Sequence, residues 1–207
     1  MNRGLDKAFV AAIGAASIAA LVCDAYAAPP AQYKCYDFEA LAPDARYSVG
    51  DVIETRHATI TIRQYFNNGN PVTADARNAH VVTSAIAGGA SPELALYLVS
   101  VNVVPKQPVT RVRTRLAQNF TETGGFANAN IAVNGEKRES LTGFAGMDGK
   151  SIGRPAKGIA SIAAAVAPTG GGNWHYGTLE LEATQGGIES FTLGGHQWRI
   201  DDMCFAL

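Results

Sequence analysis

Gly194-Gly195-His196-Gln197-Trp198-Arg199-Ile200-Asp201-Asp202-Met203-Cys204-Phe205 is the stretch of sequence on which the predicted fold depends. It sets acidic residues beside aromatic and aliphatic ones and contains one cysteine, as does Lys34-Cys35-Tyr36-Asp37-Phe38-Glu39 near the other end of the chain. This likeness predicts two strands that pair antiparallel with Cys35 facing Cys204. In that register Asp37 lies opposite Asp202 on the same face. Two carboxylates so close repel each other unless something neutralises them.

The first 27 residues are expected to form a secretory signal peptide. Arg3 and Lys7 make a positive head, an uncharged run follows over residues 8–22, and Ala25-Tyr26-Ala27 places small residues where a signal peptidase reads. The run is shorter than the roughly 20 residues that span a bilayer as a helix. We therefore expect cleavage after Ala27, no membrane span afterwards, and a secreted or periplasmic protein of bacterial type. The alternative is an uncleaved anchor.

Residues 28–207 have a length that suits one domain with its own core. The leader carries two basic and two acidic residues, so its removal leaves the formal net charge at −1. This balance argues against nucleic acid as a partner, because such binders usually carry a basic excess. Cys23 leaves with the leader, and an exported chain with only Cys35 and Cys204 is expected to join them in a disulfide. The alternative is two buried free thiols.

Short alternating segments between turn residues predict an all-β protein. Asn134-Gly135 is a strong hairpin signal. Residues 94–102 are apolar on both faces, which suits a central strand, and the alanine-rich run 159–167 has flanks that favour strand over helix. Strands are expected at 34–39, 52–54, 59–66, 79–86, 94–102, 109–118, 126–133, 136–141, 159–167, 178–183, 187–193 and 196–205. The architecture implied is a single antiparallel β-sandwich, a jelly roll with its first and last strands adjacent.

Three segments carry a resemblance to a known family: Cys35-Tyr36-Asp37-Phe38-Glu39, Val49-Gly50-Asp51, and the stretch from Gly194 to Asp202. Together they resemble bacterial secreted jelly-roll domains of the galactose-binding-like type, common among carbohydrate-binding modules. The resemblance covers both ends of the exported chain and the strand count between them. It implies a carbohydrate ligand and a structural calcium ion close to the first and last strands.

The calcium ligands predicted in this way are Asp37, Glu39 and Asp202. Calcium takes six to eight oxygen ligands, and carboxylates from adjoining strands and loops suit it. The alternative is that these side chains face solvent and pair with Arg199 or Lys34, which contributes little to stability.

Two further groups are candidate ligand-binding residues. The first group follows a run of glycines and resembles a sugar-stacking platform on a loop; it consists of Asn173, Trp174, His175 and Tyr176. The alternative is that Trp174 or Tyr176 fills the end of the sandwich. Arg111, Arg113 and Arg115 alternate along one strand and could clasp a carboxylated or sulfated polymer through bidentate contacts. Their alternative is a solvated face that pairs with Glu180 and Glu182 on a neighbouring strand.

The sequence offers little support for catalysis. The four histidines lie in four different segments without metal-ligand spacing, and there is no Gly-x-Ser-x-Gly elbow and no phosphate-cradling loop. A hydrolase that uses Glu180 with Glu182 is the least favoured interpretation. We expect an exported, non-catalytic binding module whose partner is a polysaccharide or glycan surface. The alternative is a structural or adhesive protein of the envelope or extracellular matrix that contacts other proteins.

Overall fold

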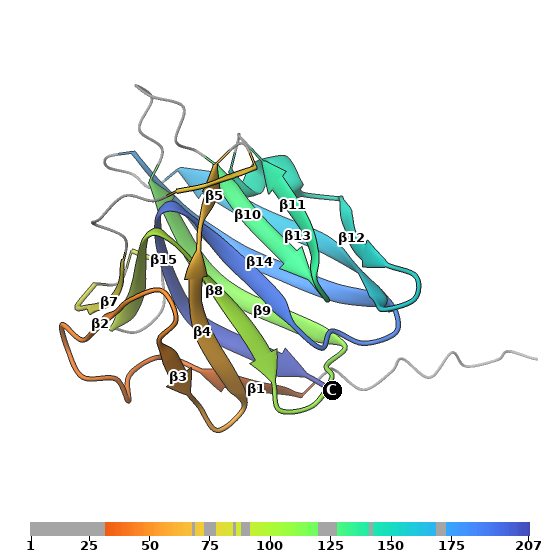
Figure 1. The fold of residues 1–207 in the computed structure, drawn as a ribbon, viewed down its shortest axis with the longest axis horizontal. Coiled ribbons are helices and arrows are strands. Elements are labelled where there is room, and N and C mark those ends of the chain that lie inside the picture. Colours follow the sequence, from red (N-terminus) through yellow and green to blue (C-terminus); the bar gives the residue numbers. More distant parts are fainter. Residues whose placement is uncertain are drawn as a thin grey trace, which may run out of the picture. The chain divides into compact units, whose positions relative to one another are not determined.

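The computed structural model describes residues 32–67, 69–72, 78–84, 86–87, 92–119, 128–140, 143–168 and 173–207 (Figure 1). The predicted signal peptide lies outside the described residues. The strands are β1 Tyr33–Tyr36, β2 Arg46–Tyr47, β3 Val52–Glu54, β4 Ala58–Gln64, β5 Phe66–Asn67, β6 Asn70–Pro71, β7 Asn78–Val82, β8 Glu93–Pro105, β9 Arg111–Asn119, β10 Ala129–Val133, β11 Glu136–Ser140, β12 Ser151–Arg154, β13 Gly158–Pro168, β14 Trp174–Gln185 and β15 Phe191–Ala206. A 3-10 turn, η1, covers Phe144–Met147.

The predicted all-β class is confirmed, and each strand pairing in the described part of the chain is antiparallel. One path of strands runs β12-β13-β14-β9-β15-β8-β4-β3, with further strands attached to β8, β10 and β15. The hairpin predicted at Asn134-Gly135 joins β10 to β11, and both turn residues have positive φ. In the part of the chain described here, no helix is long and apolar enough to cross a membrane.

The last strand, β15, belongs to two layers. Its residues 191–195 pair with β10 on one side and β8 on the other, whereas residues 198–206 pair with β9. The first layer therefore runs β11-β10-β15-β8-β4-β3 and the second runs β12-β13-β14-β9-β15. In Figure 1, β10 and β11 lie across β13 and β14. This arrangement is sandwich-like, as the sequence predicts.

The other long strand, β8, changes its partner at the same level. Residues 93–97 pair with β7 and residues 99–105 pair with β4. Between them Leu98 has a φ of 55°, a left-handed conformation that is rare for a branched side chain, and it stands level with His196 of β15. The two central strands thus bend together where the layers divide.

The prediction of two separate strands at 187–193 and 196–205 is wrong, because Gly194 and Gly195 lie inside one continuous strand. A Cβ atom on Gly194 would stand 2.0 Å from Ser100 Oγ, and one on Gly195 would stand 2.1 Å from Trp198 Nε1. These glycines permit close packing and do not form a turn.

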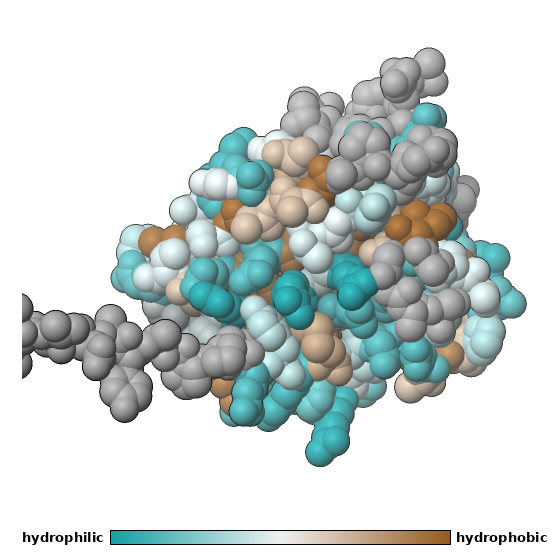
Figure 2. Space-filling view, turned by 180° about the vertical axis from the view of Figure 1, so that it is seen from behind, coloured by the Kyte–Doolittle hydropathy of each residue, from teal (hydrophilic) through white to brown (hydrophobic). Residues whose placement is uncertain are grey.

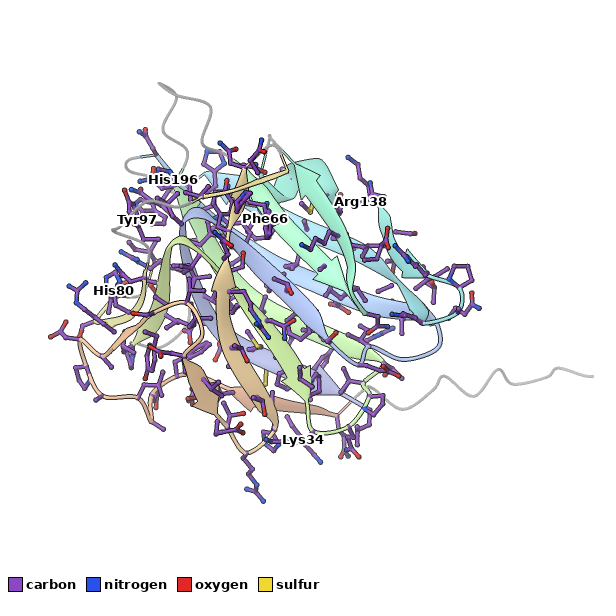
Figure 3. The ribbon with its side chains drawn as sticks, in the orientation of Figure 1. Lys34, Phe66, His80, Tyr97, Arg138 and His196 are labelled. Carbon is purple, nitrogen blue, oxygen red and sulfur yellow. A yellow bond between two sulfur atoms is a disulfide. The ribbon has the colours of Figure 1, made fainter. Side chains whose placement is uncertain are left out.

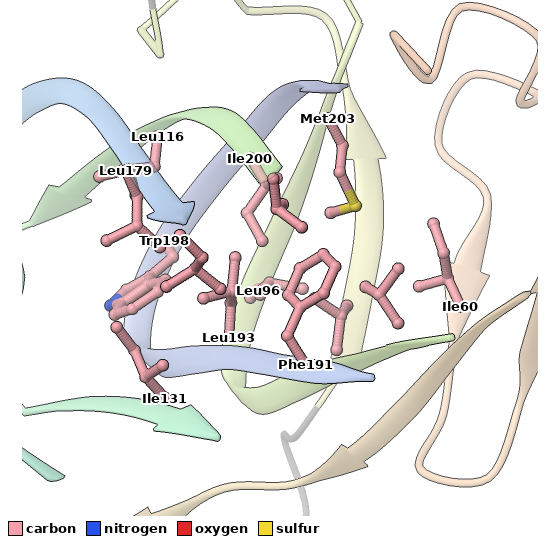
Figure 4. Packing of buried hydrophobic residues seen from close by; sticks show 14 of the residues in the cluster. Ile60, Leu96, Leu116, Ile131, Leu179, Phe191, Leu193, Trp198, Ile200 and Met203 are labelled. Atoms are coloured by element: carbon pink, nitrogen blue, oxygen red, sulfur yellow. The ribbon is translucent and has the colours of Figure 1, made fainter. Parts of the chain in front are cut away.

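The core lies between the two layers and follows the alternation of the strands. Ile60, Ile62, Val101, Leu193 and Ile131 enter it from the first layer, and Val112, Leu116, Leu179, Leu181 and Phe205 from the second. Figure 4 shows Trp198 of β15 among Ile131, Leu193 and Leu179. Phe144 of η1 packs against the same indole, with ring centroids 3.6 Å apart. The core therefore joins the two layers through β15.

The predicted pairing of the first and last strands is confirmed. Cys35 stands opposite Cys204 in the β1–β15 ladder and is bonded to it in a disulfide. The prediction that Asp37 lies opposite Asp202 is wrong, because β1 ends with Tyr36 opposite Met203. Beyond that point Asp202 forms a bulge with a φ of 44°, and Asp37 Oδ1 accepts a hydrogen bond from the Glu39 amide (3.2 Å) in a turn.

Removing the disulfide should lower stability substantially, because the bond closes a loop of 169 residues. We expect the variant Cys35→Ser/Cys204→Ser to lose about 2–5 kcal/mol in the free energy of unfolding. Urea denaturation of the oxidised protein and the variant measures this loss. An unchanged urea midpoint would show that the disulfide contributes nothing to the free energy of unfolding.

Candidate functional site

A groove of about 620 Å³, lined by both polar and apolar residues, lies on the outer face of the first layer. Its volume falls within the range of small-molecule and oligomer sites, roughly 300–1,000 Å³. The lining side chains used below are Arg63, Phe66, Asn102, Asn130, Lys137 and Thr192. Phe66 and Arg138, which also lines the groove, are labelled beside β10 and β11 in Figure 3.

The floor of the groove is a row of residues aligned by strand register. Asn102 of β8, Thr192 of β15 and Ala132 of β10 stand side by side, followed by Lys137 of β11. Arg63 of β4 lines the groove two residues beyond Thr61, which stands opposite Asn102. Residues directly opposite each other in antiparallel strands point to the same face. The strand neighbours of Asn102, Thr192 and Ala132 are apolar core residues, so alternation places these three side chains outward. Lys137 stands opposite Ala132 and therefore shares its face.

A hairpin formed by β5 and β6 closes one end of the groove. The Phe66 amide donates a hydrogen bond to Asn130 Oδ1 (2.9 Å), and Asn128 Nδ2 donates one to Asn67 Oδ1 (3.0 Å). These bonds tie the segment after β4 to β10 across the face of the layer. Lys137 Nζ lies 4.1 Å from the centroid of the Phe66 ring. The hairpin therefore supplies the aromatic ring of the groove.

Several polar groups in the groove have hydrogen-bonding capacity to spare. The Thr192 hydroxyl donates a bond to Asn102 Oδ1 (3.1 Å), which leaves the amide group of Asn102 as a donor. Asn130 Nδ2 has no hydrogen-bond partner among the described residues, but this atom is itself buried. Arg63 is exposed, and its guanidinium pairs with no residue of the described ranges. Such groups can bind a ligand rich in hydroxyls.

The predicted sugar platform lies elsewhere, on a strand and not on a loop. Residues 174–177 pair with β9 and residues 175–177 also pair with β13, so β14 begins at Trp174. Alternation points Trp174 and Tyr176 to one face and His175 to the other. The Arg199 guanidinium lies 5.3 Å from the centroid of the Trp174 ring, while Asn173 and Tyr176 are exposed. The three rings therefore do not share a face.

The predicted arginine row lies on the outer face of the second layer, and its members have partners within the chain. Arg111 pairs with Glu182, Arg115 Nε lies 2.9 Å from Asp202 Oδ2, and Arg113 lies over the Tyr33 ring. Only the Arg111–Glu182 pair is the one that the alternative interpretation expects; Arg115 and Arg113 have other partners. Arg113 and Arg115 also line a second groove of about 550 Å³ that includes Cys35 and Cys204. In Figure 2, which views the molecule from behind, hydrophilic residues gather in the middle of the face.

The predicted calcium ligands are not drawn into one group. Asp37 accepts a bond within its own turn, and Asp202 pairs with Arg115. In the part of the chain that the structure describes, no cluster of three or more His, Cys, Asp or Glu residues is placed to hold a metal ion. The calcium site at Asp37, Glu39 and Asp202 stays a prediction.

Two completely buried carboxyl groups lie next to the second layer, and the sequence did not reveal them. Glu93 accepts bonds from the Ser84 hydroxyl and from the Ala87 amide (2.6 Å). Asp201 Oδ1 accepts one from the Asp202 amide (2.8 Å), whereas its Oδ2 has no hydrogen-bond partner within the described ranges. Burial raises the pKa of Asp201 to about 6, and the negative charges of Asp202 and Glu93 act in the same direction.

Comparison with protein-family models, curated proteins and solved structures finds no match for this chain. The site is therefore judged on its own geometry. The first-layer groove combines spare hydrogen-bonding groups, an unpaired guanidinium and an aromatic ring, whereas the arginines of the second groove already have partners. Sequence reasoning missed the groove because its described residues come from six separate strands. The available signal was the polar outward positions of those strands, among them Thr61, Asn102 and Thr192.

Stability should decrease as pH rises from about 4 to about 6, because Asp201 keeps its proton in the folded chain after the unfolded chain has lost it. The shift from 3.8 to about 6 corresponds to at most about 3 kcal/mol at neutral pH. We expect Asp201→Asn to be more stable than the parent by about 1–3 kcal/mol at neutral pH and equally stable near pH 4.

Urea unfolding of both proteins across this pH range tests the prediction. Asp44→Asn, which changes the same charge at an exposed position, is the control and should leave the pH slope unchanged. A difference between Asp201→Asn and the parent that is the same at every pH would contradict the raised pKa.

Proposed function

We propose that this chain is an exported, non-catalytic binding module for carbohydrate and that the ligand lies in the first-layer groove. The observation that carries the proposal is the row of outward amide, hydroxyl and cationic side chains over strands β4, β8, β15, β10 and β11. A sugar presents many hydroxyls that donate and accept hydrogen bonds, and the groove offers both kinds of partner. Phe66 adds an apolar surface for the C–H face of a ring.

The shape of the site also favours an extended ligand. Adjacent strands lie about 4.8 Å apart, so β4 and β11, four strand spacings apart, place their side chains roughly 19 Å from each other. A floor of this length accommodates a chain of sugar units better than one small molecule. The site residues belong to paired strands, which hold them in fixed register before the ligand arrives.

The same proposal includes the finer assignment of fold and location. A jelly-roll sandwich of the galactose-binding-like type is supported by the adjacency of β1 and β15 and by the two facing layers. Export is supported by the leader-like residues 1–27 and by the disulfide, which oxidising compartments favour.

Replacing Asn102 should weaken binding, because it stands in the middle of the row. We expect Asn102→Ala to lose about tenfold in affinity for the polysaccharide that the parent protein binds best, the effect of one or two lost hydrogen bonds. A panel of immobilised polysaccharides identifies that polymer, and titration with soluble oligosaccharides measures the dissociation constant.

Trp174→Ala is the control, because it alters the other predicted platform and should leave the affinity unchanged. Thermal melting of each variant establishes that it is folded. Loss of binding in Trp174→Ala together with full binding in Asn102→Ala would place the ligand on β14 and refute the groove. Failure of the parent protein to bind any polysaccharide would refute the carbohydrate proposal.

A further inference from the structure

The charge of the first-layer groove differs from that of the chain as a whole. The chain has nearly equal numbers of basic and acidic residues. The described residues that line the groove, in contrast, include Arg63, Lys137 and Arg138 and no aspartate or glutamate. A concave surface with charges of one sign concentrates ligands of the opposite sign. The described lining of the groove therefore carries a net positive charge.

The cations stand on opposite sides of the groove floor. Arg63 belongs to β4, on one side of the central strands, and Lys137 and Arg138 belong to β11 on the other. Between them lie the amide and hydroxyl groups of Asn102 and Thr192. A polymer that lies across the strands would meet a positive charge at each side and hydrogen-bonding groups in the middle.

Arg63 and Lys137 are available to a ligand, unlike several of the chain's other cations. Among the described residues, Arg63 has no ion-pair partner, and Lys137 contacts only the ring of Phe66. By comparison, Arg154 pairs with Glu136 (2.5 Å), Arg111 with Glu182, and Lys106 with Glu54 (2.6 Å). A guanidinium forms two parallel hydrogen bonds with a carboxylate, which makes Arg63 a carboxylate-binding group.

We infer that the groove binds an acidic polysaccharide whose sugar units carry carboxylate groups. The inference rests on the proposed function, which it narrows from carbohydrate to uronate-containing carbohydrate. At neutral pH such carboxyl groups are ionised, as ordinary carboxylic acids are. One carboxylate pairs with Arg63 and another with Lys137, while hydroxyls of the intervening sugars bond to Asn102 and Thr192.

The test compares two polymers that differ only in charge, polygalacturonate and its methyl ester. Wild-type protein is expected to bind polygalacturonate at least about tenfold more tightly, and added NaCl should weaken that binding but not binding to the ester. Arg63→Gln and Lys137→Gln should each lose about tenfold for polygalacturonate only. Arg154→Gln, the same change at a paired arginine outside the groove, should have no effect.

The outcomes separate this inference from the proposed function. Equal affinity for both polymers, with no effect of Arg63→Gln or Lys137→Gln, would overturn the inference of an acidic ligand. The proposed carbohydrate binding would still stand if Asn102→Ala weakens binding to both polymers. Equal losses in Arg63→Gln and Arg154→Gln would show general charge attraction and overturn the inference. Absence of binding to either polymer and to the wider polysaccharide panel would overturn both.

Discussion

One strand, β15, is shared by two layers, and the rest of the structure depends on this constraint. Its first residues pair with β10 and β8, and its later residues pair with β9 and β1. The switch requires close approach at Gly194 and Gly195, where any side chain would collide with Ser100 or Trp198. The strand therefore runs from the groove on the first layer, which Thr192 lines, to the Cys35–Cys204 disulfide beside the second layer.

The two parts of β15 have different chemical surroundings. Thr192 points outward into a groove whose polar groups keep free hydrogen-bonding capacity, so this part suits recognition. Asp201 is completely buried, and Asp202 pairs with Arg115, so the polar groups of the second part are committed to the chain itself. A buried carboxyl with one unpartnered oxygen costs stability when it ionises. For this reason we place the proposed binding surface on the first layer.

Much of the fold was predictable from the sequence because alternation and turn chemistry are local signals. The strands around residues 59–64, 111–118 and 129–140 follow their hydrophobic pattern, and the Cys35–Cys204 register followed from the similar composition of the two ends. The glycine pair in β15 was misread, since a glycine needed for packing looks the same in sequence as a glycine needed for a turn. The loss of the Asp37–Asp202 pair was also hidden, because a bulge at one aspartate leaves no sequence signal.

The candidate site was less predictable than the fold. Trp174 and the three arginines attracted attention as conspicuous clusters, but strand pairing gives Arg111 and Arg115 acidic partners and places Trp174 under Arg199. The groove residues are single polar positions in strands far apart in sequence, and only the order β4-β8-β15-β10-β11 brings them together. Sequence patterns identify which face of each strand is polar, but they do not reveal which strands are neighbours.

The most direct test of this account is the free energy of unfolding of Gly194→Ala, measured by urea denaturation. If β15 must approach β8 as closely as the structure shows, the added methyl group meets Ser100 and costs about 1–3 kcal/mol. Both layers should still unfold in one transition, because they share the strand. Unchanged stability would contradict the account, since it would mean that β15 does not approach Ser100 of β8 this closely at Gly194.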